Sequence, residues 1–269
     1  MRKEVEKILS QYTCDFGFCE YEKVSAHLIK CANIRKIPEN AKTVITVIFP
    51  YCLEENKYEN LNVSRYAAVP DYHTVANAYL EKIVLKLSEK FENEKFVFFA
   101  DNSPINEVFT ACVSGLGKLG RNGLLINEKY GSWVFIGEIV TTLDLNVKSG
   151  EIVRCENCNK CVEACPVNAL SKENFDKDIC LSHVSQKKGD IPEEYQQMMK
   201  KYGCAWGCDI CQKVCPHNKN VMKTSIEEFI QGFQSHIEED CEIEGRAFAW
   251  RGEKVIKRNL KIINDKTEL

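Results

Sequence analysis

The chain has 269 residues, of which 44% are hydrophobic, and a formal net charge of −3. That length can bury a core in one large domain or in two modest ones. The near-neutral charge gives no indication of a nucleic-acid-binding protein, and no apolar stretch is long enough to span a membrane. The charged start MRKEVEKILSQY is typical of neither a signal peptide nor a membrane anchor, so we expect a cytoplasmic protein without membrane contact.

The first half of the chain is expected to contain both helices and strands. Residues 3–12 predict a short helix, and the β-branched or aromatic runs 43–49 and 96–100 predict buried strands. The polar stretch 52–71 predicts a loop. A helix should follow this loop, because apolar residues recur at helical spacing. These apolar positions are Val75, Tyr79, Ile83, Leu87 and Phe91.

The segment that follows the second predicted strand indicates a capped helix and then a hairpin. Ser103 is a candidate N-cap for a helix that opens at Pro104 and stops at Gly115. Residues 124–127 and 133–142 are strand-like and lie on either side of a short polar turn. They predict the two arms of a β-hairpin.

A glycine motif, G-x-G-x-x-G, spans Gly115, Gly117 and Gly120. In a dinucleotide-binding fold this motif follows a strand and opens a helix, so that the helix N-terminus faces the pyrophosphate. Here a predicted helix precedes the motif and a strand-like run follows it. We therefore reject the dinucleotide-binding interpretation and expect a loop whose backbone approaches some ligand closely.

Two cysteine runs in the second half form the most specific pattern in the sequence. The first, C-x2-C-x2-C-x3-C-P, has the ligand spacing of a bacterial ferredoxin, in which the fourth cysteine binds the second cluster of a pair. The second, C-x2-C-x3-C-P, is a shorter version of the same pattern. The runs consist of Cys155, Cys158, Cys161 and Cys165 before Pro166, and of Cys208, Cys211 and Cys215 before Pro216.

Two cubane clusters need eight thiolates, and the two runs supply seven, so the eighth ligand is either Cys180 or Cys204. Cysteine pairs also bind zinc, but a zinc site takes four ligands and would leave other cysteines of the runs without a role. Fifteen cysteines in a chain without an export signal argue against a disulfide scaffold. We therefore predict iron–sulfur clusters, in a simple electron carrier or in a redox enzyme.

The C-terminal part has a marked charge pattern. Residues 225–244 contain seven acidic residues and no Lys or Arg, whereas residues 246–261 contain six basic residues and one acidic residue. The basic run can contact phosphates, but a solvated helix face explains the same pattern. The basic residues are Arg246, Arg251, Lys254, Lys257, Arg258 and Lys261.

Several motifs, in a fixed order ahead of the cysteine runs, resemble the epoxyqueuosine reductase family, which is related to reductive dehalogenases. The resemblance covers about residues 40–260, and we expect a short form without the family's C-terminal helical-repeat domain. The motifs are Ser64-Arg65-Tyr66-Ala67, Asp71-Tyr72-His73, Asp101-x-x-Pro104-x-x-Glu107, Gly115-x-Gly117-x-x-Gly120-Arg121-Asn122, Tyr130-Gly131-Ser132-Trp133 and Gly137-Glu138.

This resemblance implies an oxidoreductase that reduces epoxyqueuosine to queuosine in the tRNA anticodon loop. Members of the family carry two [4Fe-4S] clusters, which pass electrons to a cobalamin (B12), and an external donor such as ferredoxin or flavodoxin supplies the electrons. The aspartate of the D-x-x-P motif is the proposed proton donor in the family, and that role falls on Asp101. Burial of Asp101 at the end of the preceding apolar strand would raise its pKa toward neutrality.

The resemblance also implies which residues bind each cofactor. It favours Cys180 over Cys204 as the eighth cluster ligand. One cluster is then expected on Cys155, Cys158, Cys161 and Cys215, and the other on Cys165, Cys180, Cys208 and Cys211. We predict cobalamin contacts from Arg65, Tyr66, Tyr72, His73, Gly117, Gly120, Arg121, Asn122 and Ser182.

The expected architecture is α+β, with an α/β-like cobalamin-binding core and a ferredoxin-like double [4Fe-4S] module. We expect the cobalamin- and substrate-binding domain at 1–148, the cluster module at 149–222 and a C-terminal helical segment at 223–269. Two other functions remain open on the sequence. One is a related corrinoid and iron–sulfur reductase that acts on a different small substrate, and the other is a non-catalytic electron carrier of the ferredoxin type.

Overall fold

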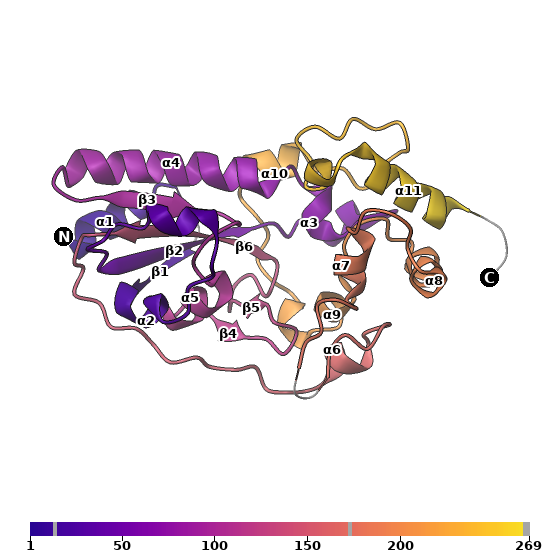
Figure 1. Cartoon of the computed structure of the whole chain (residues 1–269), viewed down its shortest axis with the longest axis horizontal. Coiled ribbons are helices and arrows are strands. Elements are labelled where there is room, and N and C mark those ends of the chain that lie inside the picture. Colours follow the sequence, from indigo (N-terminus) through magenta and orange to yellow (C-terminus); the bar gives the residue numbers. More distant parts are fainter. Residues whose placement is uncertain (13–14, 172–173, 266–269) are drawn as a thin grey trace. The chain divides into compact units, whose positions relative to one another are not determined.

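The computed structural model describes residues 1–12, 15–171 and 174–265 (Figure 1). Its contacts divide the chain into two compact units, each built from two separate segments. The first unit comprises Met1–Pro50 and His73–Glu156, and the second comprises Tyr51–Tyr72 and Asn157–Leu269. The predicted loop 52–71 therefore groups with the cysteine-rich part of the chain. The three domains expected from the sequence remain a prediction.

The first unit is built on an antiparallel sheet of four strands in the order β1-β2-β6-β3. Antiparallel pairing with helices on the faces of the sheet makes this unit α+β, as predicted. Figure 1 shows α4 on one face and α5 on the other. The strands are β1 (Asp15–Glu20), β2 (Thr43–Pro50), β3 (Phe96–Phe99) and β6 (Val134–Thr141).

The two central strands carry the core of the first unit. Every residue of β2 is buried, and all but the first of β6 are buried, because both strands pair on their two edges. Phe49 and Leu80 both come close to Gly137, which places α4 against the centre of the sheet. The helices of this unit are α1 (Arg2–Leu9), α2 (Tyr21–Ser25), η1 (Ala32–Lys36), α4 (Tyr72–Lys90) and α5 (Glu107–Val113).

Two local predictions were wrong. The helix after β3 is capped by Asn106, whose side chain accepts a hydrogen bond from the Phe109 N–H at 3.2 Å, and not by Ser103. The predicted hairpin was also wrong, because the long apolar strand β6 lies between β2 and β3. The short strand β5 (Leu125–Ile126) pairs instead with β4 (Lys118–Leu119).

The structure confirms that the glycine motif is not a dinucleotide-binding loop, since α5 precedes it and β4 lies within it. A Cβ atom added at Gly117 would lie 2.3 Å from the carbonyl oxygen of Ile126. Glycine is therefore required here by the close approach to the backbone of β5, and the expected approach of this loop to a ligand stays a prediction.

The second unit consists of short helices around an aromatic and aliphatic core. The indole of Trp206 packs edge-on against Phe248, with ring centroids 5.8 Å apart, and Ile256 and Leu260 of α11 are fully buried in the same cluster. Helix α11 also packs against α8. The helices are η2 (Glu55–Tyr58), α3 (Arg65–Ala68), α6 (Lys160–Glu163), α7 (Leu181–Ser185), α8 (Glu193–Tyr202), α9 (Ile210–Lys213), η3 (Pro216–Asn218), α10 (Glu227–Gln231), η4 (Ala249–Arg251) and α11 (Glu253–Asn264).

None of the helices within the described ranges combines the length and the apolar character that a lipid bilayer requires.

Candidate functional site

Asp101 lies in a tight turn directly after β3. Asp101 and Asn102 both have positive φ angles, of 52° and 37°, a conformation that side-chain-bearing residues seldom adopt. The side chain of Asp101 is 57% exposed. The sequence-based expectation of a partly buried aspartate was therefore wrong, because the chain turns outward at the end of the strand.

Three side chains from different elements hold this turn. The Nε2 atom of His73, at the start of α4, lies 2.8 Å from Oδ2 of Asp101. The backbone N–H of Asp101 donates to Oε1 of Glu107, in the first turn of α5, at 2.9 Å. The amide of Asn33 donates to the carbonyl oxygen of Asn102 at 2.9 Å. These contacts stabilise a strained conformation and fix the position of the Asp101 carboxylate.

Two further carboxyl groups, those of Glu107 and Glu138, lie close enough to Asp101 to interact with it electrostatically. Glu138 on β6 is fully buried; Ser103 Oγ donates to its Oε2 at 3.4 Å, while its Oε1 has no hydrogen-bond partner. Burial raises the pKa of Glu138 well above its ordinary value, and the nearby carboxylates of Glu107 and Asp101 raise it further.

Glu107 is partly buried, and burial followed by the charge of Asp101 raises its pKa to about 7. The Asp101 N–H and the His73 ring act in the opposite direction. The first unit therefore carries an exposed carboxylate backed by two carboxyl groups that can hold protons near neutral pH. Such a group of acids is suited to proton transfer.

Neither Glu107 nor Glu138 was predicted as a site residue, although both belong to the motifs that carry the family resemblance. Glu138 had a visible signal, because it is a single acid within an apolar strand, where an unpaired charge is costly. The proximity of Glu107 to Asp101 depends on the turn and on the start of α5. The sequence predicted that this helix opens at Pro104, whereas α5 begins at Glu107.

The predicted cobalamin-contacting residues are divided between the two units. His73, Gly117, Gly120, Arg121 and Asn122 belong to the first unit, where His73 pairs with Asp101. The remaining ones belong to the second unit and are Arg65, Tyr66, Tyr72 and Ser182.

Arg65 and Tyr66 have polar partners within the second unit. The buried guanidinium of Arg65 binds both carboxylate oxygens of Glu55, at 3.0 and 2.7 Å, and stacks on the ring of Tyr58. The hydroxyl of Tyr66 accepts a hydrogen bond from the Trp206 indole at 2.9 Å. These interactions fix the backbone around α3, and the predicted cobalamin contacts of both side chains stay predictions.

The two cysteine runs meet at a pair of short helices in the second unit, because α6 packs against α9. Cys158, Cys161 and Cys165 lie before, within and after α6, and Cys208, Cys211 and Cys215 have the same relation to α9. The backbone N–H of Ala169 donates to the sulfur of Cys165 at 3.3 Å, the kind of contact that stabilises a thiolate ligand. This set of donors fits iron–sulfur clusters. By its contacts, the first cysteine of the series, Cys155, belongs to the first unit.

Cys180 and Cys204 differ in what their sulfurs contact. Both lie near Cys208, so proximity does not decide which of them is the eighth ligand. The sulfur of Cys204 lies 3.4 and 3.5 Å from the carbonyl oxygens of Trp206 and Gly207. The assignment of Cys180, which precedes α7, as the eighth ligand stays a prediction.

Comparisons with known proteins agree with these features. Residues 154–218 match the family model of a 4Fe-4S double cluster binding domain, which confirms the predicted double-cluster module and opposes the zinc alternative. Residues 32–102 match the model described as epoxyqueuosine reductase QueG, DUF1730. The epoxyqueuosine reductase of Leadbetterella byssophila is 33% identical over 207 residues, which are 76% of this chain and 67% of that protein.

The chain belongs to the epoxyqueuosine reductase family.

Other members of the epoxyqueuosine reductase family are similar to this chain at comparable sequence identity. The Synechocystis sp. protein is 34% identical over 207 residues, which are 74% of this chain and 71% of that protein. The Lactococcus garvieae protein is 35% identical over 190 residues, but the match covers 68% of this chain and only 54% of that relative.

The fold matches that of a solved epoxyqueuosine reductase from Streptococcus thermophilus, with a TM-score of 0.80, 23% identity and coverage of 98% of this chain and 80% of that one. A crystal structure of an epoxyqueuosine reductase with a tRNA-TYR epoxyqueuosine-modified tRNA stem loop matches with a TM-score of 0.78 and 21% identity. That match covers 97% of this chain and 80% of the solved chain.

We predict that Cys180→Ser lowers the iron content of this family member and that Cys204→Ser does not. The first change removes a thiolate ligand, whereas the second removes a sulfur that lies beside two carbonyl oxygens. Anaerobically purified wild-type protein should hold about eight irons, and the Cys180 variant about four. Full iron content in Cys180→Ser, with loss in Cys204→Ser, would reverse the assignment.

We also predict that Glu138 lowers the stability of the first unit as the pH rises. Above about pH 4.5 the unfolded chain ionises this carboxyl group, whereas the folded chain retains the proton until its raised pKa is reached. The free energy of unfolding is therefore highest at low pH, and it falls as the pH rises from the unfolded-state pKa of Glu138 toward its raised folded-state pKa. Glu138→Gln should reduce the fall in melting temperature between about pH 6 and pH 8.5, measured by calorimetry.

The exposed Glu81 on α4 offers a matched control, and Glu81→Gln should leave that fall unchanged. An identical pH dependence of melting in wild type and Glu138→Gln would show that Glu138 ionises normally in the folded state.

Proposed function

We propose that this chain is an epoxyqueuosine reductase, which removes the epoxide oxygen of epoxyqueuosine in tRNA to leave the alkene of queuosine. The observation that carries this proposal is the Asp101 turn. It presents an exposed acid, held by His73 and Glu107, in a family member that also has the double-cluster module. A simple electron carrier has no use for such an acid.

The reaction needs electrons, and the second unit has ligands for the two [4Fe-4S] clusters that would deliver them. We propose ferredoxin or flavodoxin as the class of external donor. A bound cobalamin would supply the low-potential reducing centre that acts on the epoxide. Because the terminal nitrogens of Arg65 bind Glu55 and the Tyr66 hydroxyl accepts from Trp206, we assign these residues to shaping the backbone of that site. The other predicted cobalamin contacts remain proposals.

The residues of the first unit supply the proton. Asp101 is exposed and can therefore reach a bound substrate, and the contact with His73 orients its carboxyl group. Protonation of the epoxide oxygen turns a poor leaving group into a better one. Coverage by substrate and cofactor would displace water from Asp101 and so favour the protonated form of its carboxyl group.

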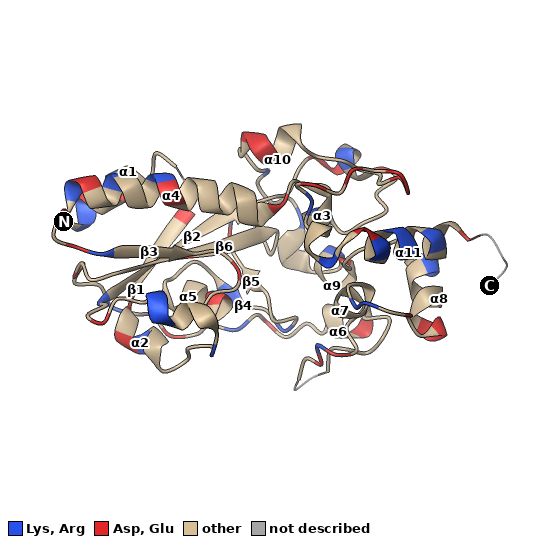
Figure 2. Cartoon of the chain, turned by 45° about the horizontal axis from the view of Figure 1, so that its top comes forward, with Lys and Arg blue, Asp and Glu red and all other residues tan. Residues whose placement is uncertain are grey.

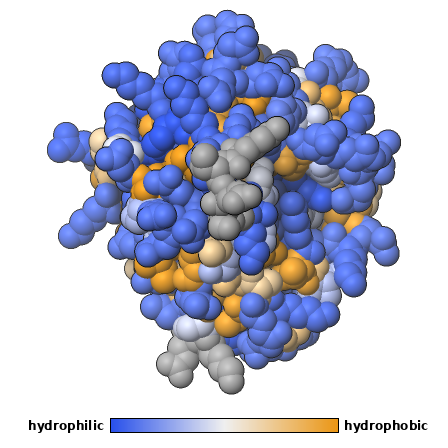
Figure 3. Space-filling model, turned by 90° about the vertical axis from the view of Figure 1, so that its right-hand side faces the viewer, coloured by the Kyte–Doolittle hydropathy of each residue, from blue (hydrophilic) through white to orange (hydrophobic). Residues whose placement is uncertain are grey.

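We further propose that the tRNA contacts the second unit along α11. Figure 2 shows Lys and Arg positions gathered along this helix, and Figure 3 shows a largely hydrophilic face with separate hydrophobic patches. Next to the helix, the Arg251 guanidinium lies 3.8 Å from the ring centroid of Trp250, whose side chain is 61% exposed. Basic groups beside an exposed aromatic ring are typical of RNA-binding surfaces.

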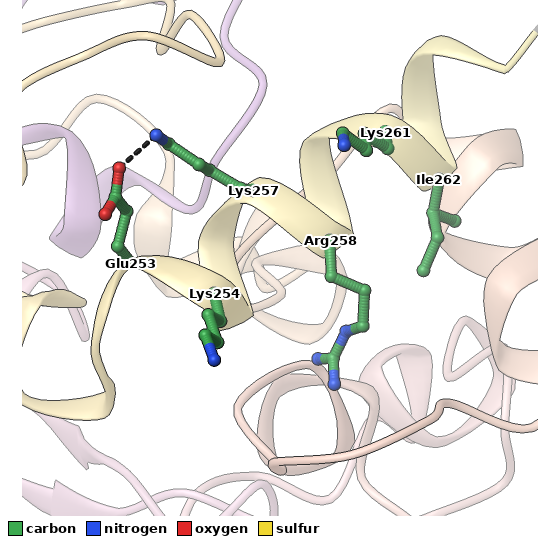
Figure 4. A pocket seen from close by; sticks show the side chains of 6 residues that line it. All are labelled: Glu253, Lys254, Lys257, Arg258, Lys261 and Ile262. Atoms are coloured by element: carbon green, nitrogen blue, oxygen red, sulfur yellow. Dashed lines mark ion pairs between the residues drawn. The ribbon is translucent and has the colours of Figure 1, made fainter.

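The basic residues of this region do not all serve the same purpose. Arg258 bonds the carbonyl oxygens of Lys187 and Ser185, and Lys257 pairs with Glu253. Figure 4 shows Lys254 and Lys261 extending from the same helix, and both are exposed. These two lysines are therefore our candidates for phosphate contacts, whereas Arg258 stabilises the fold.

The proposed function predicts that reconstituted protein, supplied with cobalamin and a low-potential reductant, converts epoxyqueuosine to queuosine in tRNA. Asp101→Asn should abolish turnover, since the amide cannot donate the proton, while iron content stays at the wild-type level. Mass spectrometry of the tRNA nucleosides measures the product. Normal turnover by Asp101→Asn would show that another group is the acid. No turnover by the wild type would favour a different substrate.

The proposed tRNA surface predicts that Lys254→Glu combined with Lys261→Glu weakens tRNA binding. Loss of two phosphate contacts should make the dependence of log K on log salt less steep by about two. Filter binding at several salt concentrations measures both effects. Lys3→Glu, a charge reversal on an exposed residue of α1, is the matched control. Equal salt slopes for all three proteins would place the tRNA elsewhere.

A further inference from the structure

Removal of an epoxide oxygen as water consumes two protons as well as two electrons. This inference rests on the proposed function, in which Asp101 gives the first proton. After that transfer Asp101 is a carboxylate and cannot give the second until it is protonated again. The structure must therefore either let solvent reprotonate Asp101 or keep a second proton in store.

Glu107 is placed to serve as that store. It contacts Asp101 through the backbone, since its Oε1 accepts the Asp101 N–H at 2.9 Å. It also lies within electrostatic range of the His73 ring, whose Nε2 is 2.8 Å from Asp101 Oδ2. Glu138 on β6 is fully buried with one oxygen unbonded, and a charge on Glu107 would disfavour ionisation of this second carboxyl group.

The titratable groups around Glu107 come from several elements. His73 stands at the start of α4, Asp101 in the turn after β3, and Glu138 on β6, where Cys19 of β1 also interacts with it. His73 is the only base among these four neighbours. The imidazole is therefore the group that can exchange a proton directly with the Asp101 carboxyl group.

We propose that Glu107 is a positioning residue that holds the Asp101 turn and stores the second proton of the reaction. In the first step the Asp101 O–H bond breaks, the proton moves to the epoxide oxygen, and one C–O bond opens. The His73 Nε2–H proton then passes to the Asp101 carboxylate, and the Glu107 carboxyl proton replaces it on the imidazole. Asp101 gives this second proton to the hydroxyl group, which leaves as water when the second C–O bond breaks.

The reduction of the epoxide also needs two electrons, which an external reductant supplies. Two electrons from the donor, which we take to be of the ferredoxin or flavodoxin class, arrive through the clusters and form the carbon–carbon double bond. Asp101 and Glu107 are both left as carboxylates, and each recovers one proton from solvent before the next turnover. A pKa of about 7 suits this cycle, because the group is then easily protonated and deprotonated near neutral pH.

Glu107→Gln separates the two roles. The amide oxygen still accepts the Asp101 N–H, so the turn should keep its position, but the amide has no proton to give. We expect unchanged iron content and melting temperature and a fall in kcat of about 100-fold. The wild-type rate should decline above about pH 7 as Glu107 ionises. This decline should be missing in Glu107→Gln and partly restored in Glu107→Asp.

A second measurement does not depend on turnover or on the glutamine variant. Infrared difference spectra of the wild type between about pH 6 and pH 8 should show a protonated-carboxyl band that disappears on ionisation. The band should be absent from Glu107→Gln and retained in Glu81→Gln.

The outcomes separate the two proposals. Turnover without the band, or with the same pH profile in wild type and Glu107→Gln, would overturn the role of Glu107 and leave the proposed function intact. The band without any turnover of epoxyqueuosine by the wild type would overturn the proposed function, and would show only that Glu107 binds a proton near neutral pH.

Discussion

The candidate site depends on the burial of a carboxyl group on the central strand of the sheet. Glu138 lies on β6, which pairs with β2 on one edge and β3 on the other, and its side chain has no access to water. An ionised carboxylate in that position would cost several kcal/mol, so the proton remains bound. The neutral group then allows Ser103 and the start of α5 to pack against it. The burial of Glu107 itself and the charge of Asp101 make the ionisation of Glu107 unfavourable, and Glu107 in turn holds the Asp101 turn.

The second unit must hold many thiolates close together. Thiolates repel one another unless a metal neutralises them, so the backbone around them must be held by other contacts. The ion pair of Arg65 with Glu55 and the hydrogen bond from the Arg65 N–H to Asp209, at 2.7 Å, provide such contacts beside Cys208. Asp209 is buried, and the contact explains how its carboxylate is tolerated. Side-chain contacts within this unit thus stabilise the loops that carry the cysteines, in addition to any stabilisation that bound clusters would give.

The sequence predicted the cluster module and most regular elements of the first unit because both rest on local patterns. Cysteine spacing is a local property, and the apolar runs of β2, β3 and α4 have clear periods. The wrong predictions concern features decided at a distance. The partners of β5 and β6 follow from competition between strands, and the cap of α5 follows from the turn at Asp101. The triad of Asp101, Glu107 and Glu138 could not be predicted for the same reason, since three separate elements bring it together.

The exposure of Asp101 has a consequence for when it can act as an acid. A carboxyl group in water is a weak proton donor at neutral pH because it is ionised, and only removal of water or a nearby negative charge changes this. Glu107 and Glu138 already have both conditions in the protein itself. At the exposed Asp101, a ligand that covers the turn would exclude water, with Glu107 and Glu138 close by. The acidity of Asp101 would then appear with substrate binding, so that the proton is available only when there is an epoxide to receive it.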